Sequence, residues 1–568
     1  LREGASTLSQ QYARNLYLTH EKTWHRKGLE AFYTIRLEMF YSKDEILEGY
    51  LNTIYFGHGA YGIEAASRFF FDKQAKDLTL EEAAMLVGIP RGPNYYSPLN
   101  DYPRAKERQQ HILTLLKDEG KISDEAYASA VNAPLAFQEK PGIYKENIAP
   151  YFQDVVLNEA ASLLGVDRES VQSGGYDIYT TLRTDLQSVL ESAIKDDMAS
   201  TEIEIGAMAI DPHTGAIRSL VGGRNYEQSS FNRAIHAKRM AGSTFKPFLY
   251  YAALEYNYTP STMLNSQPTV FQLDDNETYA PRNYNGYYAY KPITLAQSLA
   301  LSDNIYAVKT NLFLGTEQLI ETAEKFGIES DLPNVPSLAL GSASVSVEEM
   351  VRAYGLLANG GYEIEPYTIE KIVDQNGKVL YEHEETERTQ VLDPVHTFLL
   401  THLMTGMFDP SLNGYMEVTG ASMAPDLNRT YAGKSGSTHA DSWMIGFSPS
   451  LVTGIWTGYD DHRRIERVSD MNHAKNIWAH FMEQAHDGQV VENFDIPSGV
   501  VGMEIDPSTG QIATPYCQTS RLMYFKKGTE PKVHCTAHYH EEAPIIDQPR
   551  ENANEEKGFL ERLFDWFR

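Results

Sequence analysis

The residues best suited to chemistry in this sequence are a serine and a lysine three positions apart, in Ser243-Thr244-Phe245-Lys246. On a helix they share one face, and a desolvated lysine there can take the proton of the hydroxyl and make it a nucleophile. Pro247 is tolerated only in the first turn of a helix. We therefore expect the helix to begin near Ser243, with the hydroxyl at its positive end. Taken alone, the pattern is more often a helix cap beside a surface lysine.

A second motif, Ser302-Asp303-Asn304, supplies a hydroxyl and an amide. In a turn near the nucleophile, Ser302 can relay a proton and Asn304 can orient a peptide amide. The alternative interpretation is an Asx-type turn with no chemical role, which is a common structure.

A third motif, Lys434-Ser435-Gly436-Ser437, has the pattern of a strand. We expect Lys434 to bind a substrate carboxylate, and the backbone N–H groups of Ser437 and Ser243 to form an oxyanion hole. The alternative is an edge strand protected by a lysine. The other candidates for substrate contact here are Ser435, Gly436 and Thr438.

Together and in this order, the three motifs resemble those of penicillin-binding proteins and serine β-lactamases. The surrounding segments Ala241–Phe248, Leu340–Gly361 and Gly433–Trp443 narrow the resemblance to class A penicillin-binding proteins. That resemblance implies acyl transfer from D-Ala-D-Ala stem peptides through a serine acyl-enzyme, which forms peptidoglycan cross-links and is blocked by penicillin. A D-Ala-D-Ala carboxypeptidase and a non-catalytic β-lactam sensor or wall scaffold stay as alternatives. We see no deacylation base, which disfavours a β-lactamase.

The N-terminal segments Gly4–Gln11, Arg26–Glu30, Glu48–Gly57 and Leu80–Pro90 resemble motifs of the peptidoglycan glycosyltransferase domain of that family. Glycan extension needs cations to hold the departing diphosphate, for which Arg26 and Lys27 are suitable, and Glu30 can stabilise charge beside the sugar. The alternative for Lys27 and Glu30 is a surface ion pair. The other candidates taken from these motifs are Gln10, Gln11 and Asn52.

The family's first glycosyltransferase motif, which carries the general base, would precede Gly4. We expect an incomplete beginning, so that this polypeptide does not polymerise lipid II while the full-length protein does. We also expect a membrane anchor upstream, which would place the protein on the outer face of the bacterial cytoplasmic membrane. The expected partners are lipid II, glycan strands, stem peptides, β-lactams and other cell-wall synthesis proteins. Transpeptidation needs no cofactor, whereas a divalent cation is an option for the glycosyltransferase.

The elements that must position these residues divide the 568-residue chain into several parts. Residues 1–125 have helical periodicity and resemble a lysozyme-like glycosyltransferase domain. Residues 126–175 are interrupted by prolines and are predicted to be a linker region. Residues 176–490 alternate strand patterns at both ends with helices between them, which indicates an α+β transpeptidase domain whose sheet joins distant segments. Residues 491–568 are predicted to hold a hairpin, an acidic segment and a short amphipathic helix.

Composition excludes some functions and leaves the role of the two cysteines open. The net charge of −28 argues against nucleic acid as a partner, because phosphate binding needs basic surfaces. Cys517 and Cys535 can form a disulfide in an extracytoplasmic setting. Alternatively, Cys517, Cys535, His538 and His540 suggest a metal site, although solvated His-rich loops are far more common, so we predict no metal.

Overall fold

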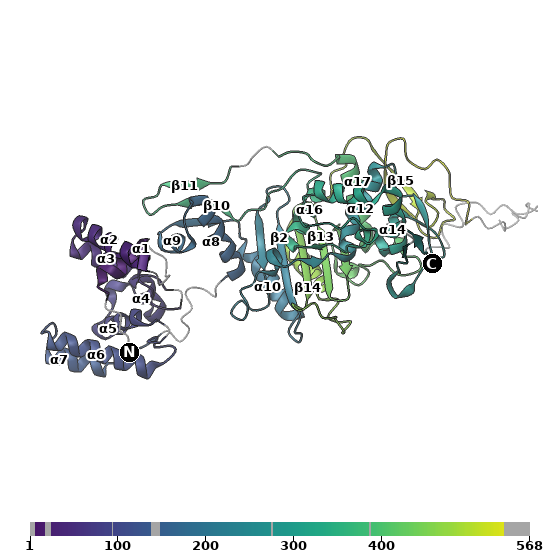
Figure 1. Cartoon of the computed structure of the whole chain (residues 1–568). Helices are drawn as coiled ribbons and strands as arrows, with labels where there is room; N and C mark the ends of the chain where they lie inside the picture. Colours follow the sequence, from purple (N-terminus) through teal and green to yellow (C-terminus); the bar gives the residue numbers. More distant parts are fainter. Residues whose placement is uncertain are drawn as a thin grey trace, which may run out of the picture.

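The computed structural model describes residues 6–17, 24–58, 60–93, 95–137, 148–273, 277–384 and 388–538. Its N-terminal part is helical, as predicted, and gathers at one end of the molecule (Figure 1). A core around Phe56, Phe70 and Leu86 holds its middle helices together, and Leu113 and Ala130 join the last two. Its helices are α1 (Leu8–Tyr17), α2 (Trp24–Phe40), α3 (Lys43–Thr53), α4 (Ile63–Phe71), α5 (Leu80–Gly88), α6 (Tyr102–Asp118) and α7 (Asp124–Asn132), with short 3-10 helices at Ala75–Asp77 and Ile89–Arg91.

The segment predicted as a linker region is helical in α8 (Pro150–Leu164) and α9 (Arg168–Ser173), as well as in α7. Phe152 and Val156 of α8 are buried in the core of the following domain. This stretch is therefore helical and packed, whereas its assignment as a region between two domains stays a prediction. Pro150 occupies the first turn of α8, where its missing N–H costs no hydrogen bond, so this proline starts a helix instead of interrupting one. The exact domain boundaries stay predictions.

A five-stranded antiparallel sheet organises the second part of the chain, in the order β12-β13-β14-β2-β3. It confirms that distant segments share one sheet, and both predicted hairpins form. Its strands are β2 (Glu204–Ile210), β3 (Ile217–Val221), β12 (Ala432–Ser437), β13 (Asp441–Phe447) and β14 (Val452–Gly458). A smaller sheet contains β1 (Asp177–Thr180), β10 (Ile369–Val373) and β11 (Val379–Glu382).

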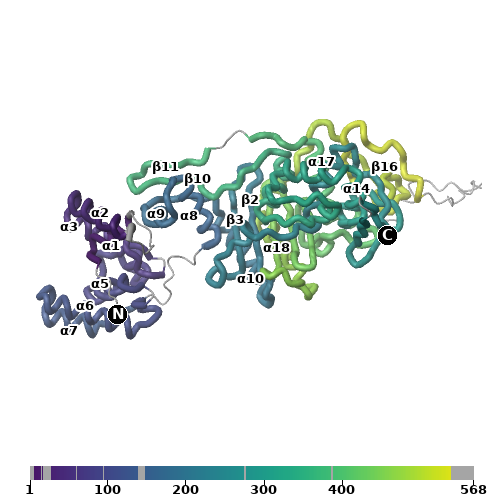
Figure 2. Tube along the Cα trace, viewed as in Figure 1, coloured from purple at the N-terminus to yellow at the C-terminus, as the bar shows by residue number. Residues whose placement is uncertain are grey.

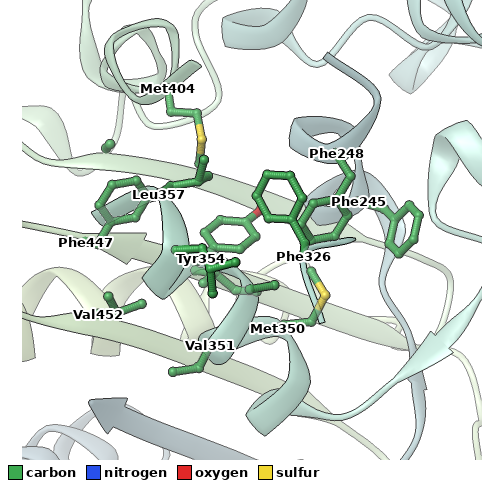
Figure 3. Packing of buried hydrophobic residues seen from close by; sticks show 14 of the residues in the cluster. Phe245, Phe248, Phe326, Met350, Val351, Tyr354, Leu357, Met404, Phe447 and Val452 are labelled. Carbon is green, nitrogen blue, oxygen red and sulfur yellow. The ribbon is translucent and has the colours of Figure 1, made fainter. Parts of the chain in front are cut away.

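Alternating side chains of the central sheet enter two different cores, as the period of a strand requires. On one face, Met444 and Ile455 pack with α10 (Thr184–Asp197) and α18 (His473–Ala485). On the other face, Phe447 packs in a cluster with Tyr354, Phe248 and further helical residues (Figure 3). The helices of this second layer are α12 (Lys246–Glu255), α13 (Leu295–Leu301), α14 (Asn304–Leu314), α15 (Thr316–Lys325), α16 (Val347–Ala358) and α17 (Pro394–Thr405).

The remaining elements are short or lie towards the C-terminus, where Figure 2 labels β16 in the yellow part of the trace. They include α11 (Arg233–His236), β4 (Arg239–Met240), β5 (Met263–Ser266), β6 (Phe271–Gln272), β7 (Thr278–Tyr279), β8 (Lys291–Thr294), β9 (Ser344–Val345) and 3-10 helices, among them η3 (Gly242–Phe245) and η6 (Pro336–Leu340). Strands β15 (Val500–Asp506), β16 (Gln511–Ile512) and β17 (Arg521–Lys526) form a C-terminal sheet. The predicted amphipathic helix near the C-terminus lies outside the described residues.

Candidate active site

A cavity of about 570 Å³ lies where η3, the α13–α14 connection and strand β12 meet. Residues from all three serine-site motifs line it, namely Ser243, Ser302, Asn304, Ser435, Gly436 and Ser437. The sequence predicted that these motifs act together, and the fold brings them to one place although they are far apart along the chain.

Ser243 lies in η3, which runs directly into α12, and Pro247 occupies the first turn of α12 as predicted. Gly242 has φ +55°, a left-handed conformation that side chains with a Cβ disfavour. The hydroxyl of Tyr354 donates to the carbonyl of Thr244 at 2.7 Å, which ties η3 to the buried helix α16. The backbone on either side of Ser243, at Gly242 and Thr244, is therefore fixed where the helix begins.

Strand β12 passes very close to η3. A Cβ on Gly436 would lie 2.6 Å from the carbonyl oxygen of Ala241, and one on Gly242 would lie 3.1 Å from the backbone nitrogen of Ser437. Only glycines permit this approach. It places the backbone amide of Ser437 beside the segment that carries Ser243, which is the arrangement that an oxyanion hole needs.

Lys246 is fully buried beneath the cavity. Its Nζ donates to the carbonyl of Ser302 at 2.7 Å, to the Ser302 hydroxyl at 3.1 Å, and to Asn304 Oδ1 at 2.8 Å. Burial lowers the pKa of Lys246 to about 7, opposed in part by the charge of Asp303. A sizeable fraction of Lys246 is therefore neutral near neutral pH and can accept a proton.

Ser302 ends helix α13 with φ +60°, an uncommon conformation for a residue that is not glycine. Its hydroxyl accepts hydrogen bonds from both Lys246 and Lys434, with Lys434 Nζ at 3.0 Å. Burial, followed by the nearby charge of Lys246, holds the pKa of Lys434 well below its ordinary value. Lys434 was expected to bind a substrate carboxylate, but its ammonium points to Ser302 and the carbonyl of Ser435.

Asn304 is held by its neighbours more firmly than the sequence suggested. Its Nδ2 donates to the carbonyl of Arg282 at 2.7 Å, and its backbone N–H donates to Asn283 Oδ1 at 2.8 Å. Next to it, buried Asp303 caps α14 and accepts hydrogen bonds from Asn283 and Tyr415. Sequence reasoning missed this support, because nothing in the spacing of Asn283 and Tyr415 links them to the motif.

The other residues predicted on β12 have different surroundings. Ser435 and Ser437 line the cavity. Thr438 lies just beyond β12, where its hydroxyl donates to Asp441 Oδ2 at 2.8 Å and accepts from the backbone N–H of Asp441. Thr438 thus closes the turn between β12 and β13 and is not among the residues that line the cavity.

Lys475, on helix α18, lines the same cavity and was missed by the sequence analysis. Its Nζ donates to the carbonyl of Thr419 at 3.1 Å, and burial lowers its pKa. No motif marks this residue, because only the packing of α18 brings it to the cavity. Lys475 and Arg282 are both among the residues that line the cavity, whereas Lys434 is not.

The N-terminal candidates converge in part. Lys27 forms an ion pair with buried Glu30, and its Nζ also donates to the hydroxyl of Ser6 at 3.2 Å. Gln11 Nε2 donates to the carbonyl of Ser6 at 3.2 Å, and the hydroxyl of Tyr50 donates to Gln11 Oε1. Helices α1, α2 and α3 therefore bring Lys27, Glu30 and Gln11 into one network.

The other N-terminal candidates are not part of that network, or their side chains lie outside the described residues. Gln10 Oε1 accepts a hydrogen bond from the backbone N–H of Thr7 at the start of α1. Asn52 is exposed near the end of α3. Arg26 lies in the first turn of α2, but its side chain is outside the described residues.

The two cysteines are free thiols in this structure, so the disulfide that the sequence left open is not formed here. Their sulfur atoms lie close to each other and to the carboxylate of Asp506. His538 also reaches this carboxylate, with Nε2 at 3.0 Å from Oδ2, whereas His540 lies outside the described residues.

Comparisons with protein families agree with this arrangement. A model described as "Transglycosylase" matches residues 1–117, and one described as "Penicillin binding protein transpeptidase domain" matches residues 205–451. A third, "Penicillin-binding protein 1A, C-terminal domain", matches residues 496–540.

Similar proteins span most of the chain. Penicillin-binding protein 2D of Bacillus subtilis is 53% identical over 535 residues, covering 94% of this chain and 77% of the relative. Penicillin-binding protein 1A of Aquifex aeolicus is 31% identical, covering 94% of this chain and 83% of the relative. The crystal structure of penicillin-binding protein 1A from Haemophilus influenzae superposes with a TM-score of 0.73 at 25% identity, over 92% of this chain and 94% of that one.

Proposed function

The chain belongs to the class A penicillin-binding proteins, which synthesise peptidoglycan with a glycosyltransferase and a transpeptidase domain, and we propose that Ser243 is its acylating nucleophile. The observation that supports this most is the fully buried Lys246, whose pKa is lowered to about 7 and whose amine donates to Ser302 and Asn304 of the second motif. The same arrangement disfavours a purely structural scaffold. Burying two lysines costs free energy, and buried groups with strongly shifted pKa values cluster at functional sites.

Acylation would proceed through bonds that these residues can make and break. Ser243 Oγ attacks the carbonyl carbon of the D-Ala-D-Ala amide while neutral Lys246 takes its proton. The backbone amides of Ser243 and Ser437 hold the developing oxyanion. A proton then passes through Ser302, which contacts both lysines, to the departing amine of the terminal D-Ala. An amine of a second stem peptide attacks the acyl-enzyme, forms the cross-link and returns the hydroxyl to Ser243.

We assign the substrate carboxylate to the cavity-lining Lys475 with the hydroxyls of Ser435 and Ser437. Lys434 then acts behind the cavity surface, where it holds Ser302 and adds positive potential. This division of roles follows from where the two ammonium groups point.

Labelling with fluorescent penicillin tests the nucleophile. We expect one label per chain, on the peptide that contains Ser243, and none in Ser243→Ala. Ser422→Ala is the matched control, because Ser422 lines the same cavity. Label that persists in Ser243→Ala, or that disappears in Ser422→Ala, contradicts the assignment. Products from a stem-peptide donor and acceptor amine then separate cross-linking from hydrolysis by a carboxypeptidase.

For the glycosyltransferase region, we propose that Lys27 holds the diphosphate of lipid II and that Glu30 stabilises charge beside the sugar. Lys27 and Glu30 form an ion pair in which Glu30 is buried. This supports the assignment, because a fully exposed ion pair contributes little. A divalent cation stays a prediction. If present, it would bind the diphosphate oxygens of the substrate and help to neutralise their charge, as Mg²⁺ commonly does. The predicted lack of polymerisation by this polypeptide also stays a prediction.

Class A penicillin-binding proteins are membrane-anchored enzymes of cell-wall synthesis, and we propose the outer face of the cytoplasmic membrane for this chain. Within the described ranges, every helix is too short or too polar to cross a bilayer. The anchor and the other cell-wall partners therefore stay predictions. Recovery of the full-length protein in the membrane fraction, with penicillin labelling from the outer side, would support the location.

A further inference from the structure

Two hairpins of this protein have the same turn motif, but the aspartate in each turn has different side-chain partners. In the β2–β3 turn, Asp211 accepts from the backbone N–H of His213 through Oδ1 and pairs with Arg218 through Oδ2, at 3.0 Å. In the β15–β16 turn, Asp506 accepts from the backbone N–H of Ser508 through Oδ1, at 2.9 Å. Its Oδ2 faces a thiol and an imidazole where the first turn has an arginine.

The groups around Asp506 Oδ2 are metal-ligating types. The thiol of Cys535 lies 3.2 Å from this oxygen, and His538 Nε2 lies 3.0 Å from it. One ligand atom each of Asp506, Cys517 and Cys535 lies within 4.8 Å of the other two. Asp506 and Cys535 are almost fully buried, and Asp506 also accepts hydrogen bonds from the hydroxyls of Ser508 and Thr509. Among the residues that the structure describes, this is the only such group of three or more.

We propose that Asp506, Cys517, Cys535 and His538 form a binding site for a Zn²⁺ ion. A tetrahedral zinc ion with bonds of about 2.0 Å to oxygen and nitrogen and about 2.3 Å to sulfur separates its ligand atoms by roughly 3.3–3.8 Å. The separations of Cys535 Sγ and His538 Nε2 from Asp506 Oδ2, 3.2 Å and 3.0 Å, are slightly shorter. His538 lies outside the group whose ligand atoms are all within 4.8 Å of one another, so its side chain must shift to complete the site. Two thiolates, one imidazole and one carboxylate are a ligand set suited to zinc.

The local backbone also holds the sulfur of Cys517 in place. The backbone N–H of Thr514 donates to Cys517 Sγ at 3.3 Å, while the N–H of Cys517 donates to the carbonyl of Thr514. On binding, Zn²⁺ would displace one proton from each thiol, and the neutral imidazole of His538 would bind through its lone pair.

A metal ion at this site would attach the last described segment, which carries Cys535 and His538, to the catalytic domain. Ile512 and Met523 of the C-terminal sheet are packed on or within the large core. The carbonyl of Pro507, next to Asp506, accepts a hydrogen bond from Thr294, at 3.1 Å. Thr294 caps helix α13, and that helix ends at Ser302 in the active site. A metal at Asp506 would therefore stiffen a support of the helix that carries Ser302.

The test uses the whole 568-residue chain, purified with a reductant and then freed of metal by a chelator. We expect it to take up one Zn²⁺ per chain, measured by elemental analysis. We expect Co²⁺, used as a spectroscopic probe, to give thiolate-to-metal charge-transfer absorption. Cys517→Ser and His538→Ala should weaken zinc binding by more than the roughly 10- to 100-fold that loss of an outer-shell partner causes.

The matched control is His534→Ala, because His534 lies on the same segment but outside the cluster. It should bind zinc as the unchanged chain does. Penicillin labelling of every variant shows whether the catalytic domain is folded. Two free thiols with no zinc uptake by a penicillin-labelled chain would overturn the proposal. So would a chain whose mass is two hydrogens lower and whose thiols are unreactive before any metal is added, because it holds a disulfide.

Discussion

Lys246 and Lys434 contact the same hydroxyl, that of Ser302, and both are buried. Two ammonium groups at such a distance repel each other strongly when water is excluded, so the pair favours a state in which at least one amine is neutral. Ser302 lies between them in a strained left-handed conformation. A strained backbone conformation persists only where surrounding contacts hold it. Here the hydrogen bonds from Lys246 and Lys434 hold Ser302.

Acylation by penicillin should depend on pH through Lys246. Since Lys246 acts as a base only when neutral, and its pKa is lowered to about 7, the acylation rate should rise as pH increases through that value and level off above it. Lys246→Met should slow acylation by about 10²- to 10⁴-fold and remove this pH dependence. Stopped-flow labelling from acidic to mildly alkaline pH measures both effects.

Lys309→Met is the control for that experiment. Lys309 lies on α14 and donates to the carbonyl of Asn265, away from Ser302, and burial lowers its pKa too. It should keep both the rate and the pH profile. A Lys246→Met variant that retains the profile would mean that another group takes the proton.

At the residue scale, the sequence predicted the members of the site better than their roles. Ser243, Lys246, Ser302 and Asn304 were identified from type and spacing, and the fold brings them together. The direction of Lys434 was not predictable, because spacing does not tell where a long side chain ends. Lys475 was missed since its place depends on how α18 packs.

At the scale of elements, the close approach of η3 to β12 positions the proposed oxyanion donors, the backbone amides of Ser243 and Ser437. Gly242→Ala should slow penicillin acylation towards the roughly 10²- to 10³-fold loss seen when an oxyanion donor is removed, because the new Cβ would meet the backbone of Ser437. Gly377→Ala is the control. Gly377 also has a positive φ, +80°, but a Cβ there meets nothing within 4 Å. Equal loss of acylation in both variants would refute a role for the close approach.

The α13–α14 connection depends on buried Asp303. Tyr415→Phe removes a hydroxyl that donates to Asp303 Oδ2 at 2.8 Å. A hydrogen bond to a charged group contributes about 1.5–3 kcal/mol, so the free energy of unfolding should fall by about that much. Denaturant unfolding measures it. Tyr256→Phe removes the hydroxyl of an exposed tyrosine, which donates to Gln318, and should change stability far less. A similar loss there would argue against this account.

The helices and strands around the site were largely predictable because their hydrophobic periods are regular. The predicted hairpins at 206–221 and 505–512 and the strands around 442–459 are present. The helices within residues 126–175 were not predicted, because prolines mark helix starts as well as interruptions. Pro150 starts α8, whose packing against the later domain no local pattern reveals.

At the scale of the whole molecule, the two enzymatic regions have separate cores. Residues such as Phe70 and Leu86 form the N-terminal cores, whereas Phe248, Tyr354 and Phe447 belong to the core beside Ser243. Because few side chains join separate cores, changes at one site should leave the chemistry of the other unaltered. The sequence suggested this division through its change from helical to strand patterns.

That independence can be measured with one pair of variants. Lys27→Ala should weaken binding of lipid II, measured by fluorescence polarisation, because the diphosphate loses a cation. It should leave penicillin acylation within about two-fold, since additivity holds for distant sites. Ser243→Ala should do the reverse and keep lipid II binding. If Lys27→Ala also slowed acylation in a chain of unchanged thermal stability, the two regions would be coupled, and Lys27 would influence Ser243 by a route that the separate cores do not provide.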